Sequence, residues 1–230
     1  MGIKKLSEVK QRNRQVGFIG TVKGEIVEVN VGTTKKGQPY ANGKVLLDGA
    51  RHPTSFVVFN TRNNENLVSQ FIAKCEEDAN VIFTSVVAQE PYEKDGKTRI
   101  ATKLTIISIP DPDKAAKIKD FTTFNFMGEH REEGTVYDTM DDGRSYLIFK
   151  LDVKRSWFNK DEQKEESRTE NFELVAYGDQ ADKVAMEHAE TPNGTMVQGK
   201  ATIDGNRINI KSLVVAPPPS DENSEEVPFS

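Results

Sequence analysis

Apolar positions along the chain follow one order twice, and this order predicts two copies of one design. Apolar residues recur at three- to four-residue spacing in residues 67–75 and again in residues 181–188, which predicts one helix in each half of the chain. Each helix follows a short apolar strand and precedes two further strands, which are 56–59, 81–87 and 101–109 in the first half, and 172–175, 195–201 and 207–215 in the second.

The order of these elements predicts the fold. A strand opens after a turn at Gly37-Gln38-Pro39-Tyr40 and again at Gly143-Arg144-Ser145-Tyr146. Strands with one helix between the third and the fourth, followed by a hairpin, are the order of a five-stranded OB barrel. Because the two helices are separate, we expect an all-β protein of two tandem five-stranded OB-fold barrels, each with one short helix, rather than one ten-stranded sheet.

Breaks in the pattern predict the domain boundaries. Pro110-Asp111-Pro112-Asp113 interrupts regular structure, and Ala115 to Lys119 has the composition of a short helical turn. The chain after residue 216 combines prolines with acidic residues and cannot build a core, so we expect disorder there. The expected units are a basic N-terminal arm (1–15), a first OB domain (16–110), a linker (111–120), a second OB domain (121–216) and a disordered acidic tail (217–230).

Composition favours a protein of a reducing compartment. The one cysteine, Cys75, excludes an intramolecular disulfide framework. Residues 1–15 are charged and lack the apolar centre of a secretion signal, and no apolar run approaches the ~20 residues of a membrane helix. We therefore expect a soluble protein without a membrane partner, located in the cytoplasm of a bacterium or of a phage-infected host.

Charge is distributed unevenly along the chain. The formal net charge is −5, yet residues 1–112 hold 16 Lys/Arg against 12 Asp/Glu. Residues 113–215 hold 15 against 20, and the last fifteen residues hold four acidic residues and no Lys or Arg. A groove that tracks phosphates needs local positive charge rather than a positive total. The first barrel is therefore better suited to phosphates than the second.

Residues 142–178 carry the most specific motif. Asp142-Gly143-Arg144 opens an apolar strand, the only tryptophan, Trp157, closes it, a polar loop of residues 158–170 follows, and the next strand ends at Tyr177-Gly178. This pattern resembles the core of bacterial and phage single-stranded-DNA-binding proteins, although Asn171 stands where that family usually has a second stacking tryptophan. The resemblance implies a non-enzymatic OB protein that binds single-stranded DNA without sequence specificity and serves DNA replication, recombination and repair.

Candidate binding residues in the second barrel surround the tryptophan. An exposed ring stacks on any base, and Lys154 and Arg155 beside it suit phosphates. The alternatives are that Trp157 is a core residue, or that Phe158 is the solvent-facing ring, since strand alternation exposes one of the two. The resemblance also implies base stacking by Tyr177, whose alternative is packing at the barrel rim.

Candidate residues in the first barrel are mostly basic. Tyr92 lies in a long hairpin with Lys94, Lys97 and Arg99, and aromatics among cations are typical of nucleic-acid binding. The alternative is a hairpin whose charges only keep it soluble. The first turn contributes Lys35 and Lys36, followed by Tyr40 at the strand start. Counted from Gly37, Arg51 takes the place that Trp157 has after Gly143, although Arg51 is equally compatible with an ordinary surface charge.

The C-terminal tail resembles the acidic tip of the same family, which docks on replication and repair proteins. Here Glu225 and Glu226 lead to Val227, Pro228 and Phe229, and Ser230 follows the phenylalanine. We expect partner docking through this segment, because solubility alone explains charge but not an apolar end.

No enzyme or cofactor motif stands out. The three histidines are scattered, without triad or metal spacing, and no phosphate-binding glycine loop is present. We expect no catalytic residue, no cofactor and no metal. Two other functions stay open, a protein–protein adaptor on OB barrels and an RNA-binding OB protein, and the chain suits a monomer or a homodimer.

Overall fold

The computed structural model describes residues 17–159, 163–188 and 191–216. In chain order the elements are β1 (Gly17–Thr33), β2 (Pro39–Leu47), β3 (Thr54–Phe59), α2 (Leu67–Glu77), β4 (Asn80–Lys94), β5 (Lys97–Ser108), α3 (Pro112–Ala115), β6 (Phe124–Thr139), β7 (Ser145–Asn159), β8 (Lys164–Tyr177), α4 (Asp179–His188), β9 (Met196–Asp204) and β10 (Arg207–Val215). No helix among the described residues is both long enough and apolar enough to cross a membrane.

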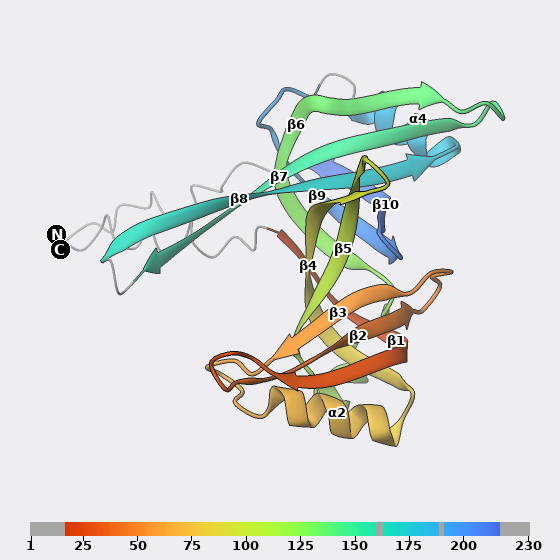
Figure 1. The fold of residues 1–230 in the computed structure, drawn as a ribbon. Helices are drawn as coiled ribbons and strands as arrows, with labels where there is room; N and C mark the ends of the chain where they lie inside the picture. The colour runs from red at the N-terminus through yellow and green to blue at the C-terminus, as the bar shows by residue number, and fades with distance from the viewer. Residues whose placement is uncertain (1–16, 160–162, 189–190, 217–230) are drawn as a thin grey trace, which may run out of the picture.

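The strands close into two barrels (Figure 1). Strands β2, β3, β5, β4 and β1 follow one another in hydrogen-bonded order, and a β2–β1 pairing closes this ring as barrel 1. Strands β6, β7, β8, β10 and β9 do the same, closed by β6–β9, as barrel 2. The prediction of two tandem five-stranded OB barrels is confirmed. The two rings are also hydrogen-bonded to each other, through a short pairing of β1 with β6 from Gly17↔Met127 to Ile19↔Asn125.

Both barrels bury the alternate residues of their strands, as a half-buried pleated strand requires. Helix α2 covers barrel 1, where Phe71 packs against Phe56 with ring centroids 5.2 Å apart. The cores meet at Phe18, whose ring lies 5.1 Å from that of Phe126 and 4.5 Å from that of Phe172. Phe172 is 1 % exposed and belongs to the core.

A polar junction also holds the barrels together. The turn between β9 and β10 reaches barrel 1, where the Asp204 carboxylate accepts hydrogen bonds from the backbone N–H groups of Arg51 (2.9 Å) and His52 (2.7 Å). Asn206 accepts from the backbone N–H of Thr102 through its side chain and from the Thr102 hydroxyl through its carbonyl. These hydrogen bonds therefore link the two barrels directly.

Two sequence expectations differ from the structure. The polar loop predicted after Trp157 is instead a hairpin in which β7 and β8 stay paired as far as Asn159↔Lys164, and together they extend beyond barrel 2 as a two-stranded arm (Figure 1). The sequence of the arm is mostly polar, so it lacks the apolar alternation that marks a half-buried strand. The short helix of the linker begins at Pro112 rather than near Ala115, because proline is pre-organised for the first helical position.

Candidate nucleic-acid interface

The outward residues of β1, β2, β3 and β5 form one surface, here called the barrel-1 face. Its residues line up in rows across the strands, because cross-strand partners point to the same side of a sheet. One row joins Glu28, Lys44, Ser55 and Lys103, and another joins Gly32, Tyr40 and Phe59. Residues at the alternate, inward positions of β2 and β3, such as Ala41, Val45 and Phe56, are buried in the core.

Two aromatic rings stand together on the barrel-1 face. Tyr40 and Phe59 are cross-strand partners with ring centroids 6.0 Å apart and an interplanar angle of 38°, and Phe59 is 40 % exposed. Gly32 makes room for this arrangement, since a Cβ there would lie 2.8 Å from the Tyr40 ring. The pair offers an aromatic platform on which flat apolar groups can stack.

Lysines surround this platform. Lys44 and Lys103 are exposed on either side of Ser55, and neither has an ion-pair partner among the residues that the structure describes. Lys35 and Lys36 are exposed in the turn from β1 to β2, where the backbone N–H of Thr34 donates to the Gln38 carbonyl. The barrel-1 face thus has an aromatic pair at one end of its strands, with Lys35 and Lys36 in the adjoining turn and Lys44 and Lys103 in the row four residues further along.

The β4–β5 hairpin carries the second predicted group. Tyr92 pairs with Arg99 and Lys94 with Lys97, so the four side chains share one face of the hairpin. Its two-residue turn, Asp95-Gly96, has positive φ at both residues (54° and 68°), as a type I′ turn requires. In Figure 1 this hairpin rises from barrel 1 and lies against barrel 2, where Gln89 exchanges hydrogen bonds with the backbone of Glu173.

Arg51 and Trp157 do not occupy equivalent structures. Arg51 lies in the short connection from β2 to β3, with its backbone bound to Asp204 and its side chain exposed. Trp157 lies in strand β7 opposite Glu166. Counting residues from Gly37 and from Gly143 therefore does not identify equivalent positions, because β2 ends at Leu47 whereas β7 continues to Asn159.

The barrel-2 face, formed by the outward residues of β6, β7, β8 and β10, repeats the barrel-1 rows. Tyr146 and Tyr177 are cross-strand partners, as Tyr40 and Phe59 are, and Tyr177 is 39 % exposed. Lys150 stands opposite Glu173, and the two form an ion pair. Asp152 lies 3.6 Å from Arg131 and accepts a hydrogen bond from Asn171. Lys150 and Arg131 on this face are therefore each close to a carboxylate of the protein itself.

The turn before β7 is also internally paired. The side chain and backbone N–H of Arg144 donate to Asp142, and these hydrogen bonds lower the pKa of that carboxyl. On the β7–β8 arm, Lys154 is exposed opposite Thr169. The backbones of Arg155 and Phe158 lie in β7 with that of Trp157, while their three side chains lie outside the described part of the structure, as do the N-terminal arm and the tail residues Glu225 to Phe229.

Each histidine makes contacts of a structural kind. His130 stacks on Phe149, the His188 ring lies 3.1 Å from the Leu213 carbonyl, and the His52 ring lies 3.1 Å from Asp204. No group of three or more His, Cys, Asp or Glu side chains within the described residues is arranged to hold a metal ion. Burial raises the pKa of the Cys75 thiol to about 11, so it is protonated at neutral pH.

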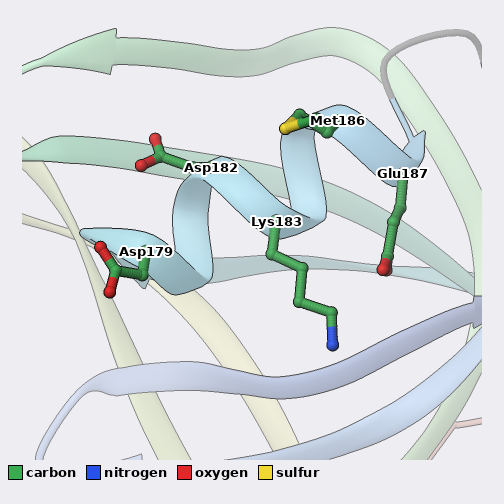
Figure 2. A pocket seen from close by; sticks show the side chains of 5 residues that line it. All are labelled: Asp179, Asp182, Lys183, Met186 and Glu187. Carbon is green, nitrogen blue, oxygen red and sulfur yellow. The ribbon is translucent and has the colours of Figure 1, made fainter.

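A hollow of about 410 Å³ on the outer side of α4 does not look like a reaction site. It is lined by Asp179, Asp182, Lys183, Met186 and Glu187. Figure 2 shows that Lys183 and Glu187 leave the helix on one side while Met186 leaves it elsewhere, so the side chains do not converge on a common point. Their chemistry, three carboxylates with one lysine, is also unsuited to phosphates.

Solved structures with the same architecture are single-stranded DNA binding proteins. The wild-type protein from Thermus aquaticus superposes with a TM-score of 0.54 at 12 % identity, covering 87 % of this chain and 92 % of that one. A deletion mutant of the same Thermus aquaticus protein gives a TM-score of 0.51 at 14 % identity, covering 89 % and 96 %. This chain shares their fold. The expected resemblance is confirmed at that level, while no family model and no curated protein matches the sequence.

Sequence reasoning missed three residues of the barrel-1 face. Phe59 was expected only as the end of an apolar strand, and Lys44 and Lys103 lie in separate strands with no local motif. Strand alternation offered a signal, since Lys44 precedes Val45 and Lys103 precedes Leu104, and a polar residue next to an inward apolar one takes the outward position of a half-buried strand.

Proposed function

We propose that this protein binds single-stranded DNA without sequence specificity and that the barrel-1 face is its main contact surface. The observation that carries the proposal is the Tyr40–Phe59 platform on OB strands that also carry Lys44 and Lys103, two exposed lysines with no ion-pair partner among the described residues. Every base has a π-face, so stacking on these rings does not depend on sequence. The lysines neutralise phosphates and release counterions.

Single strands suit this surface better than duplex. Bases inside a duplex are already stacked on each other, so their faces are unavailable to Tyr40 and Phe59. The β4–β5 hairpin, with Tyr92, Lys94, Lys97 and Arg99 on one face, extends the same surface. On barrel 2, Tyr177, Lys154, Arg155, Trp157 and Phe158 form a second, weaker contact region.

The tail adds recruitment to this function. Glu225 to Phe229 combine negative charge with an apolar anchor, which suits a basic-rimmed apolar pocket on a replication or repair protein. We assign binding to two OB units, residues 16–110 and 121–216 joined by the linker 111–120, working in the cytoplasm as a monomer or a homodimer.

Salt-titrated binding to single-stranded DNA, duplex DNA and RNA tests the proposal. We expect tight binding to oligo-dT, weak binding to duplex, and a log–log salt slope of roughly 0.7 per neutralised phosphate. Equal affinity for duplex contradicts the proposal. Tighter binding to RNA favours the RNA-binding alternative, and no binding at low salt favours the adaptor.

Trp157, as the only tryptophan, gives a direct optical test of the β7–β8 arm. Stacking on a base should quench its emission when poly-dT is added, and Trp157→Ala should weaken binding without unfolding the protein. Unchanged emission at saturation argues against stacking at this residue.

A further inference from the structure

A groove lies between the two barrels, where the β4–β5 hairpin meets β8 and β10. Its volume is about 320 Å³, and residues of all four strands line it. Arg99 of barrel 1 and Arg207 of barrel 2 both belong to its lining. Because it joins the hairpin of barrel 1 to the outward side of β8, the groove connects the barrel-1 face with the barrel-2 face.

Hydrogen bonds between the barrels hold the groove open in one shape. Gln89 donates from its side-chain amide to the Glu173 carbonyl (3.3 Å) and accepts from the Glu173 N–H (2.7 Å). Asn206 accepts two hydrogen bonds from Thr102, one from its backbone N–H to the Asn206 side-chain oxygen and one from its hydroxyl to the Asn206 carbonyl. A ligand that enters the groove therefore meets an arrangement that is already formed, which reduces the ordering cost of binding.

The charge available in this groove is positive. Glu173 is its one carboxylate, and Lys150 already pairs with that group. Arg207 is exposed and has no ion pair among the described residues, and Arg99 has only a distant, exposed partner in Asp95 at 3.7 Å. An arginine fork matches the geometry of a phosphate oxygen pair, so two arginines in one groove, one from each barrel, suit one stretch of sugar–phosphate backbone.

We propose that this groove is a crossing site, where Arg99 and Arg207 hold the backbone of one continuous single strand as it passes from the barrel-1 face to the barrel-2 face. This inference rests on the proposed function and deepens it, because it adds a contact that neither barrel makes alone. The crossing makes binding depend on strand length, since only a strand that occupies both barrels contacts Arg207.

The test compares Arg207→Gln with wild type in the full chain, using fluorescently labelled oligo-dT of two lengths. A strand of about 8 nucleotides fits within the ~4–16-nucleotide site of one OB fold, and a strand of about 35 nucleotides exceeds two such sites. The matched control is Lys211→Gln, an exposed cation on the same strand that does not line the groove. Thermal melting by circular dichroism verifies that each variant is folded.

We expect Arg207→Gln to lower affinity for the long strand about five- to tenfold at low salt and to reduce its salt slope by roughly 0.7, which is the loss of one phosphate contact. Arg99→Gln should act in the same direction, while Lys211→Gln should bind both lengths like wild type. Short-strand affinity should stay unchanged in Arg207→Gln.

Two results overturn the crossing while leaving single-stranded-DNA binding intact. One is wild-type affinity and salt slope of Arg207→Gln on the long strand. The other is an equal loss on both lengths, which assigns Arg207 to a site within barrel 2. Failure of the wild-type protein to bind either strand instead refutes the proposed function, and the crossing with it.

Discussion

The two barrels present corresponding rows of residues that differ in where their carboxylate stands. On barrel 1 the row is Glu28, Lys44, Ser55 and Lys103, and the Glu28 carboxylate at its β1 end accepts a hydrogen bond from Asn30 and forms no ion pair among the described residues. On barrel 2 the row is Arg131, Lys150 and Glu173, and Arg207 lies beyond it on β10. The aromatic pair, Tyr40 with Phe59, likewise corresponds to Tyr146 with Tyr177. On barrel 2 the Glu173 carboxylate forms an ion pair with Lys150. On barrel 1 the corresponding residue is Ser55, which cannot pair with Lys44, so Lys44 stays available to phosphates. Pairing within the protein, more than the number of cations, therefore sets how much charge a face can offer to phosphates.

Removing the aromatic platform should produce the largest effect on binding. Stacking is worth about 1–3 kcal/mol per base, so Tyr40→Ala and Phe59→Ala should each weaken oligo-dT binding by that amount at a fixed salt concentration. Tyr177→Ala, on barrel 2, should weaken oligo-dT binding by a smaller amount. Titrations monitored by fluorescence anisotropy give the ranking, and Tyr40→Phe serves as the control that keeps a ring. A larger loss from Tyr177→Ala than from Tyr40→Ala would reverse the proposed roles of the barrels.

Exchanging the central residue of the two rows tests the pairing argument directly. Ser55→Glu puts a carboxylate between Lys44 and Lys103, so we expect affinity to fall about tenfold and the salt slope to drop by roughly 0.7 to 1.4, the contribution of one or two phosphates. Glu173→Ser keeps the backbone hydrogen bonds to Gln89 and releases Lys150, so affinity should rise. If neither exchange changes the salt slope, phosphates do not contact these rows.

Much of this architecture was readable in the sequence. The two helices, their places between strands and the short β9–β10 turn all follow from local periodicity and turn residues. The rows were not readable, because Lys44, Ser55 and Lys103 meet only through strand register, and register depends on pairings distant in sequence. The hydrogen bonds of Asp204 and Gln89 between the barrels could not be predicted for the same reason. The arm beyond barrel 2 was not predicted as paired strands because its mostly polar sequence lacks the apolar alternation of a half-buried strand.

The junction between the barrels should depend on Asp204 and on pH. Burial opposes ionisation of this carboxyl, but hydrogen bonds from the backbone of His52 and Arg51 and from the His52 ring outweigh it, so its pKa is lowered. A lowered pKa in the folded state stabilises the protein above the unfolded value of about 3.9, and this contribution is lost as pH falls further.

We therefore expect Asp204→Ala to reduce the free energy of unfolding by about 1–3 kcal/mol at pH 7, through the lost hydrogen bonds to a charged oxygen, and we expect this reduction to shrink as pH falls below the unfolded value of about 3.9. Asp204→Asn keeps one acceptor oxygen, so its free energy of unfolding should lie between those of wild type and Asp204→Ala. Thermal denaturation at pH 7 and pH 3 measures both. A deficit of Asp204→Ala that is the same at the two pH values would show that the charge contributes nothing to docking the barrels.

Removing the tail should have the smallest effect on DNA affinity. The effect should depend on the lysines of the barrel-1 face and not on the barrel-2 face. Residues 220–230 carry four carboxylates, which can occupy the same lysines as phosphates do, so their deletion should raise oligo-dT affinity a few-fold at low salt. The gain should vanish in Ser55→Glu, where Lys44 and Lys103 are already engaged, and persist in Tyr177→Ala. Phe229→Ala keeps the tail's charge and should leave DNA affinity unchanged while losing partner proteins in a pull-down. Recovery of the same partners by wild type and Phe229→Ala would restrict the tail to this electrostatic competition, because Phe229 is its aromatic anchor.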